Sequence, residues 1–131
     1  MTNLYVDTSA LLKRVFIETE SAQVRAILRS RNAAGDLLAS SALAWVEVSR
    51  ALLRAGVTDA GTALNTACSG IARQPLDSAT LTRARTIGAA YLRSLDAIHL
   101  AAAITLGAVE ILTFDQRLAE AAETVGVQAI P

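Results

Sequence analysis

Short apolar runs alternate along the chain with longer segments in which apolar residues recur at helical spacing. The short runs are typical of strands buried in a parallel sheet, and the longer segments are typical of helices with one apolar face. The run at 109–114 is the clearest strand, whereas Pro75 interrupts the run at 71–76. Strands are therefore predicted at 4–6, 37–39, 71–76, 109–114 and 127–130.

Capping residues and glycines mark the ends of the predicted helices. Ser40 and Ser41 are good caps for a helix that Gly56 ends, and Gly126 ends the last helix. A short helix is predicted after Thr8 and Ser9, which can cap it. Further helices are predicted at 21–31, 42–55, 58–70, 77–91, 94–107 and 116–125.

The elements then follow the order β-α-α-β-α-α-β-α-α-β-α-β. Strands that alternate with helices indicate an α/β fold, with a parallel sheet covered by helices on both faces. The length of 131 residues fits a single domain over 1–131, and a hydrophobic content of 53% is enough to fill its core.

Composition excludes several classes of protein. Twelve basic and twelve acidic residues give a net charge of zero, which argues against a chain that coats nucleic acid by charge alone. Cys68 is the only cysteine, so we expect a buried apolar thiol rather than a disulfide or a zinc site. No apolar stretch reaches the ~20 residues of a membrane span, and the amino terminus does not resemble a secretory signal. A soluble cytoplasmic protein is expected.

Two aspartates directly follow predicted strands. Asp7 comes after the strand at 4–6, and Asp115 comes after the strand at 109–114. Open parallel sheets bind ligands at the carboxyl ends of their strands, so these two acids are candidates for one site. Each could instead cap the helix that follows it. The sequence leaves both interpretations open.

Asp96 lies in the first turn of a helix that is almost wholly apolar. Acids favour helix amino termini by ~0.3–1 kcal/mol, which would explain Asp96 without any function. However, the segment Leu95-Asp96-Ala97-Ile98-His99-Leu100 continues into three alanines, and a helix that is apolar all round is buried. A charge at that place must pair with another group or be neutralised.

Glu47 lies in the middle of a predicted helix, between Val46 and Val48. An exposed acid that pairs with Arg50 or Arg54 on the same face is the alternative explanation. That pairing explains less well why the charge interrupts an apolar run. We therefore count Glu47 among the candidate site residues.

Four carboxylates without a partnered histidine point to a hard cation, Mg²⁺ or Mn²⁺, rather than to zinc. The only histidine, His99, is expected to be a packed or supporting group. The chain has neither a serine nucleophile elbow nor a glycine-rich phosphate loop. A phosphatase with Asp7 as its nucleophile is an alternative. Such enzymes usually carry a second aspartate two residues later, where this chain has Ser9.

Four motifs, in this order and at these spacings, resemble the PIN domain, and most closely the VapC-type toxins of bacterial toxin–antitoxin pairs. The resemblance covers essentially the whole chain. Each motif is weak alone, but the combination in a chain of this size is specific. The motifs are Tyr5-Val6-Asp7-Thr8-Ser9-Ala10-Leu11, Glu47 after Ala39-Ser40-Ser41, the segment 95–103 around Asp96, and Leu112-Thr113-Phe114-Asp115.

The resemblance implies a three-layer α/β/α fold with a parallel five-stranded sheet. It also implies hydrolysis of RNA with Mg²⁺ or Mn²⁺, leaving a 5′-phosphate and a 3′-hydroxyl. By resemblance, Asp7 and Asp96 are the principal metal ligands, and Glu47 and Asp115 complete the cluster directly or through water. Polar positions that support the site in the family correspond to Thr8, Ser9 and Thr113.

The family also implies partners. A VapB-type antitoxin is expected to silence the toxin by covering its active-site groove, and a homodimer and a toxin–antitoxin hetero-oligomer are usual. A catalytically silent PIN-like binding module is the non-enzymatic alternative, which the loss of an acid would favour, and none is lost. The candidates for contacts with RNA phosphates, each of which could instead form a solvated charged face, are Lys13, Arg14, Arg50, Arg54 and Arg93.

Overall fold

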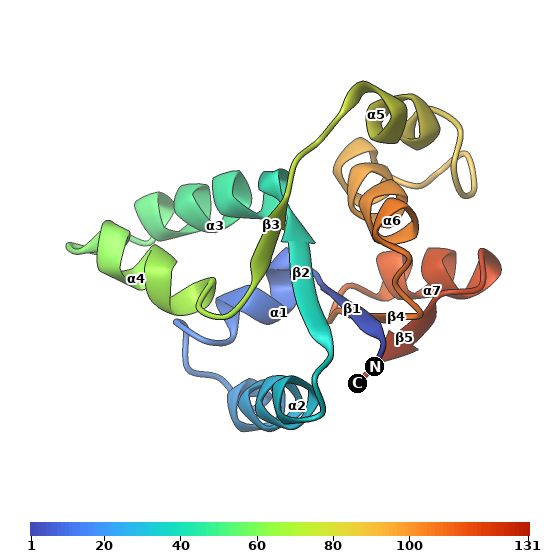
Figure 1. The fold of residues 1–131 in the computed structure, drawn as a ribbon. Coiled ribbons are helices and arrows are strands. Elements are labelled where there is room, and N and C mark those ends of the chain that lie inside the picture. The colour runs from blue at the N-terminus through green and yellow to red at the C-terminus, as the bar shows by residue number, and fades with distance from the viewer.

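The computed structural model describes residues 1–131, and at its centre lies a sheet of five parallel strands in the order β3-β2-β1-β4-β5 (Figure 1). Strand β1 is central and pairs with β2 on one side and with β4 on the other. The predicted α/β class and all five strands are confirmed. The strands are β1 (Asn3–Val6), β2 (Leu37–Ser41), β3 (Ala72–Gln74), β4 (Glu110–Leu112) and β5 (Gln128–Ile130).

Seven helices connect the strands in the predicted order. Helices α1 to α4 contribute to the core on one face of the sheet. Helices α6 and α7 cover the other face, and α5 packs against α6 (Figure 1). The helices are α1 (Thr8–Leu12), α2 (Ser21–Ala33), α3 (Ala42–Arg54), α4 (Ala60–Ala67), α5 (Ser78–Ala84), α6 (Ser94–Leu106) and α7 (Gln116–Thr124).

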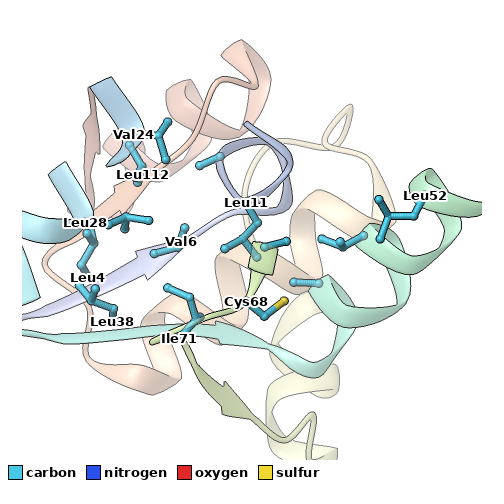
Figure 2. Packing of buried hydrophobic residues seen from close by; sticks show 14 residues of the cluster. Leu4, Val6, Leu11, Val24, Leu28, Leu38, Leu52, Cys68, Ile71 and Leu112 are labelled. Carbon is cyan, nitrogen blue, oxygen red and sulfur yellow. The ribbon is translucent and has the colours of Figure 1, made fainter. Parts of the chain in front are cut away.

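Alternation along β1 divides the core between the two faces of the sheet. Leu4 and Val6 point into the cluster beneath α1 to α4, together with Leu112 of β4 (Figure 2). Tyr5 points to the opposite face, where it packs in the cluster that contains Leu100 of α6. Because both faces are covered, three consecutive residues of the central strand, Leu4, Tyr5 and Val6, are apolar and fully buried. This arrangement is the three-layer α/β/α architecture that the resemblance implies.

The helix predicted at 77–91 is the largest error of the sequence analysis, because α5 ends at Ala84. Gly88 adopts a φ of +75°, which a right-handed helix does not allow. A Cβ atom at Gly88 would lie 2.8 Å from Cδ2 of Leu92, so any other residue would also require this side chain to move. The chain therefore turns between α5 and α6 instead of continuing as a helix.

Two smaller predictions are wrong in part. Strand β4 ends at Leu112 rather than at residue 114, because the turn into α7 has already begun: the Thr113 hydroxyl accepts a hydrogen bond from the amide of Asp115. Ser41 stands at the N-cap of α3, but its hydroxyl makes no capping bond. By contrast, the prediction that a helix starts at Ser94 is confirmed, with Arg93 as the N-cap of α6.

The direction of winding reverses beside β1. The chain proceeds from β1 through β2 to β3, and then crosses over to β4 and β5 on the other side. Such a reversal leaves a crevice at the carboxyl ends of the two adjacent strands. Val6 pairs with Leu112, so the residues that follow these strands, including Asp7 and Thr113, meet at this point.

Two further expectations bear on the chain as a whole. Cys68 is buried and makes no disulfide, as expected. None of the helices combines the length and the apolar character needed to cross a membrane.

Candidate active site

Asp7 lies at the crevice between β1 and β4 and is only 5% exposed. Its amide donates to the carbonyl of Leu112 at 2.9 Å, which continues the β1–β4 pairing by one residue. One carboxylate oxygen, Oδ2, accepts hydrogen bonds from the hydroxyls of Ser9 and Thr113, at 2.7 and 2.8 Å. The same oxygen is the N-cap of α1, through the amide of Ser9. Asp7 therefore occupies a position that the two strands jointly determine.

Asp115 caps α7 in a similar way. Its Oδ1 accepts hydrogen bonds from the amides of Arg117 and Leu118, and its own amide donates to the Thr113 hydroxyl. The Oδ2 of Asp115 accepts no hydrogen bond. The capping interpretation of Asp7 and Asp115 is thus correct for one oxygen of each carboxylate. Capping does not compete with a role in a site, because the second oxygen of each group is not used by the cap.

Asp96 differs from the other two aspartates because its side chain does not cap a helix. It lies in the first turn of α6, which begins after Arg93, and its carboxylate accepts no hydrogen bond. Burial, followed by the negative charges of Asp115 and Asp7, raises the pKa of Asp96 above its ordinary value, although His99 and Arg93 oppose this effect. Three aspartates from β1, α6 and β4 are therefore close enough to repel one another.

Glu47 projects from α3 and is held by two side chains. Its Oε1 accepts a hydrogen bond from the Thr8 hydroxyl at 2.7 Å and another from Nε2 of His99. Burial alone would raise the pKa of Glu47, but the hydrogen bonds and the charge of His99 lower it below its usual value. Glu47 makes no ion pair with Arg50 or Arg54, so the alternative explanation offered by the sequence does not hold.

His99 corrects the expectation that the four acids have no partnered histidine. Its ring is 2% exposed, and besides Glu47 its Nε2 lies 3.6 Å from Oδ1 of Asp7. Its Nδ1 lies 2.7 Å from the hydroxyl of Tyr5, which also accepts a bond from the amide of Ser41. Burial favours the neutral imidazole, but the hydrogen bond to Glu47 and the nearby charges outweigh it and raise the pKa of His99 to about 10.

The donor set suits a hard divalent cation. The oxygens that no cap uses are Oδ1 of Asp7, Oδ2 of Asp115 and both oxygens of Asp96, and carboxylate oxygens are preferred by Mg²⁺ and Mn²⁺. Glu47 offers only Oε2, because its other oxygen is held by Thr8 and His99. No three of the acidic, histidine or cysteine side chains already converge in a geometry that could hold an ion. The donor chemistry of these carboxylates fits such a cation.

The basic residues proposed to contact RNA fall into two groups. Lys13 forms ion pairs with Glu18 and Glu20 and lies over the ring of Phe114, 5.3 Å from its centre. Arg14 donates to two backbone carbonyls and makes no ion pair. The second group is exposed to solvent and makes no ion pair with a carboxylate. It consists of Arg50, Arg54 and Arg93.

A model of the PIN domain family matches residues 4–124, which contain all four acids. The chain belongs to the PIN domain family. It is 39% identical to a protein named ribonuclease VapC46 from Mycobacterium tuberculosis, over 99% of this chain and 98% of that protein. A second relative from the same species, ribonuclease VapC47, is 38% identical over 73% of this chain and 71% of its own length. These matches place the chain among the VapC-type members of the family.

Solved structures show the same fold. The VapBC2 complex of Rickettsia felis, which was crystallised with a DNA fragment from its promoter, matches with a TM-score of 0.77 over 98% of this chain and 97% of the matched chain. The Mycobacterium tuberculosis toxin VapC20, which cleaves the sarcin–ricin loop, matches with a TM-score of 0.71 over 90% of this chain and 94% of its own. Their sequence identities are 10% and 16%, so these matches concern the fold.

The network that joins His99 to Tyr5 and Glu47 was not predicted from the sequence. One signal was present: His99 follows Asp96 by three residues, which places both side chains on nearly one face of α6. The position of Tyr5 was also readable, since alternation in β1 directs it to the face opposite Val6. The contact with Glu47 depends on how α3 and α6 approach each other across the sheet edge, which no local pattern encodes.

The raised pKa of His99 predicts how the stability of the metal-free protein depends on pH. A group whose pKa is higher in the folded state stabilises the protein fully below its unfolded value, about 6.5, and this contribution is lost as the pH rises toward 10. Between about pH 6 and about pH 8, the wild type should lose on the order of 1–2 kcal/mol of unfolding free energy through this group.

Urea unfolding in EDTA at both pH values measures this loss. The variant His99→Gln keeps a polar side chain but cannot titrate, and it should lose much less stability over the same interval. Cys68 titrates only at higher pH and does not contribute to this comparison. Parallel pH dependences in the wild type and the variant would contradict a charged His99.

Proposed function

We propose that the chain is a metal-dependent endoribonuclease that hydrolyses phosphodiester bonds with Mg²⁺ or Mn²⁺ and acts as the toxin of a VapBC-type pair. One observation carries the proposal. Asp7, Asp96 and Asp115 lie near the ends of β1 and β4, each with an oxygen that no cap uses, and burial together with the charges of Asp115 and Asp7 raises the pKa of Asp96. A cluster of like charges at a sheet edge is costly without a ligand that compensates it.

In this proposal, Asp7 and Asp96 are the principal metal ligands, and Asp115 and Glu47 complete the site directly or through water. When bound, the cation supplies positive charge that neutralises the scissile phosphate and lowers the pKa of a water molecule. Ser9 and Thr113 hold Asp7 through its Oδ2 and leave Oδ1 free to face the cation. Thr8 and His99 fix the position of Glu47 at the edge of the same cluster.

The competing phosphatase is disfavoured by the same hydrogen bonds. The position two residues after Asp7, where an acid would be needed, is Ser9, and its hydroxyl donates to Asp7 instead of protonating a leaving group. A silent binding module is disfavoured because all four acids lie at the carboxyl edge of the sheet, where the family places its site. The expected partners are an RNA substrate, a VapB-type antitoxin and a second copy of the chain.

Cleavage of RNA tests the proposed chemistry. The purified protein should cut structured RNA in Mg²⁺ or Mn²⁺, leave 5′-phosphate ends, and stop when EDTA is added, because the carboxylates alone provide no positive charge to the phosphate. End-labelled RNA resolved on a denaturing gel measures this outcome. Cleavage that continues in EDTA would show that the aspartates work by another mechanism.

The substitution Asp96→Asn separates a metal ligand from a structural residue. Cleavage should fall by orders of magnitude, because one ligand charge is lost. The metal-free variant should be at least as stable as the wild type, because a repelling charge has been removed. Added Mg²⁺ should raise the melting temperature of the wild type and raise that of the variant less.

Asp59→Asn is the matched control for this experiment. Asp59 caps α4 through the amide of Thr62, outside the cluster, so the same chemical change should leave both cleavage and the response to Mg²⁺ unchanged. An Asp96→Asn variant that remains active, with the Mg²⁺ response of the wild type, would remove Asp96 from the proposed site.

Expression in a bacterial host tests the role as a toxin. The chain alone should slow growth, and co-expression of its cognate VapB-type antitoxin should restore it. The variant Asp96→Asn, produced at an equal level, should not slow growth. Normal growth with soluble, active wild-type protein would leave the nuclease chemistry intact but contradict the toxin role.

A further inference from the structure

A polar groove lies between α2 and the end of α4, apart from the aspartate cluster. Two adjoining cavities form it, and they share Arg14, Arg25 and Ser69 in their walls. Arg29 and Asn32 of α2 extend one end, and threonine and asparagine side chains of α4 line the other. No acidic residue lines either cavity, so this region is positively charged although the net charge of the chain is zero.

Arg14 forms the fixed part of the groove. Its Nη1 donates to the carbonyls of Ala67 and Ser69, at 2.9 and 2.7 Å, and these two hydrogen bonds anchor the guanidinium against the end of α4. The side chain is half-buried and has no carboxylate partner, and its burial lowers the pKa of Arg14. A guanidinium has five N–H donors, so Nε and Nη2 remain free to bind an anion. A partly desolvated charge of this kind is favourable when an anion compensates it.

Arg25 and Arg29 stand on the facing helix, one turn apart. Both are exposed, and neither makes an ion pair. Like charges at this spacing repel each other and destabilise a helix. The neighbouring Arg31 shows the contrasting case, since it is neutralised by Asp36 and Glu110. The groove thus gathers three positive charges that nothing else in the chain compensates.

The lining of the groove favours a phosphate backbone over a protein segment. Guanidinium groups bind phosphate oxygens in a bidentate manner, and serine, threonine and asparagine side chains are frequent partners of phosphate and sugar groups. Protein partners are usually anchored by apolar or aromatic side chains. Leu28 and Leu38 are the only apolar residues in the walls, and both are buried.

We propose that this groove binds phosphate groups of the RNA on one side of the cleavage point, an inference that rests on the proposed ribonuclease function. Helix α1 connects the two places, since Asp7 caps its start and Arg14 follows its end (Figure 1). Seven residues of helical chain span roughly 10–14 Å, a distance that a few nucleotides cover. The groove supplies affinity for the RNA and positions it relative to the cleavage point, and the aspartate cluster supplies the chemistry.

The test compares RNA binding by two double variants of the full chain. Arg25→Gln with Arg29→Gln removes the exposed charges of the groove and leaves the anchored Arg14 in place. Arg83→Gln with Arg85→Gln removes two exposed arginines beside α5, on the other face of the sheet, and is the matched control. Anisotropy of a short fluorescein-labelled RNA in EDTA measures binding without cleavage, and cleavage is measured separately in Mg²⁺.

The groove variant should bind RNA about 5–20-fold more weakly than the wild type at physiological salt. The slope of the logarithm of its RNA affinity against the logarithm of the salt concentration should be shallower by about 1.4. This is about 0.7 for each phosphate that the variant no longer neutralises. The control should change affinity less than about twofold. Equal affinities and salt slopes for the two double variants would overturn the proposal, as would a wild type that cleaves RNA in Mg²⁺ but does not bind it in EDTA.

Two other results are distinguishable from these. A groove variant that keeps its RNA affinity but loses affinity for poly-glutamate would assign the groove to an acidic protein segment, and the proposal would be wrong. A wild type that neither binds nor cleaves RNA would overturn the ribonuclease function itself, and with it the inference drawn from it.

Discussion

The parallel pairing of β1 with β4 is the constraint on which the site depends. These strands are distant in the sequence, and the register Val6 to Leu112 brings their carboxyl ends together. Hydrogen bonds from Ser9 and Thr113 to one oxygen of Asp7 then tie the two strand ends to each other. A shift of one residue in this register would turn the side chains of β4 to the opposite face of the sheet and separate these groups.

The same pairing concentrates negative charge, and the fold compensates it unequally. Helix amino termini and hydroxyl groups stabilise one oxygen each of Asp7 and Asp115, and His99 pairs with Glu47. Asp96 receives no hydrogen bond, and burial, followed by the charges of Asp115 and Asp7, raises its pKa. A cation that binds to these oxygens would therefore stabilise the fold as well as enable the proposed chemistry, so that ligand binding and folding are linked.

Charge is also separated across the molecule. The acids lie at the carboxyl edge of the sheet, whereas uncompensated arginines gather between α2 and α4. A net charge of zero is the total over the whole chain and describes neither of these regions. For the recognition of a polyanion, the local field at a groove matters more than the total, because salt screens distant exposed charges.

The sequence by itself determined the order of the elements and the parallel sheet, and it singled out the four candidate acids, because these depend on local patterns: apolar runs, caps, glycines and residues that follow strands. It failed at residues 85–91, where the chain leaves the helix and Gly88 adopts a positive φ in the turn toward α6. Only the tertiary structure decided that His99 pairs with Glu47, that Asp96 accepts no hydrogen bond, and that Arg14 anchors a basic groove. The surroundings of His99, Asp96 and Arg14 are formed by residues from separate elements. These surroundings depend on how the helices pack across the sheet rather than on any spacing along the chain.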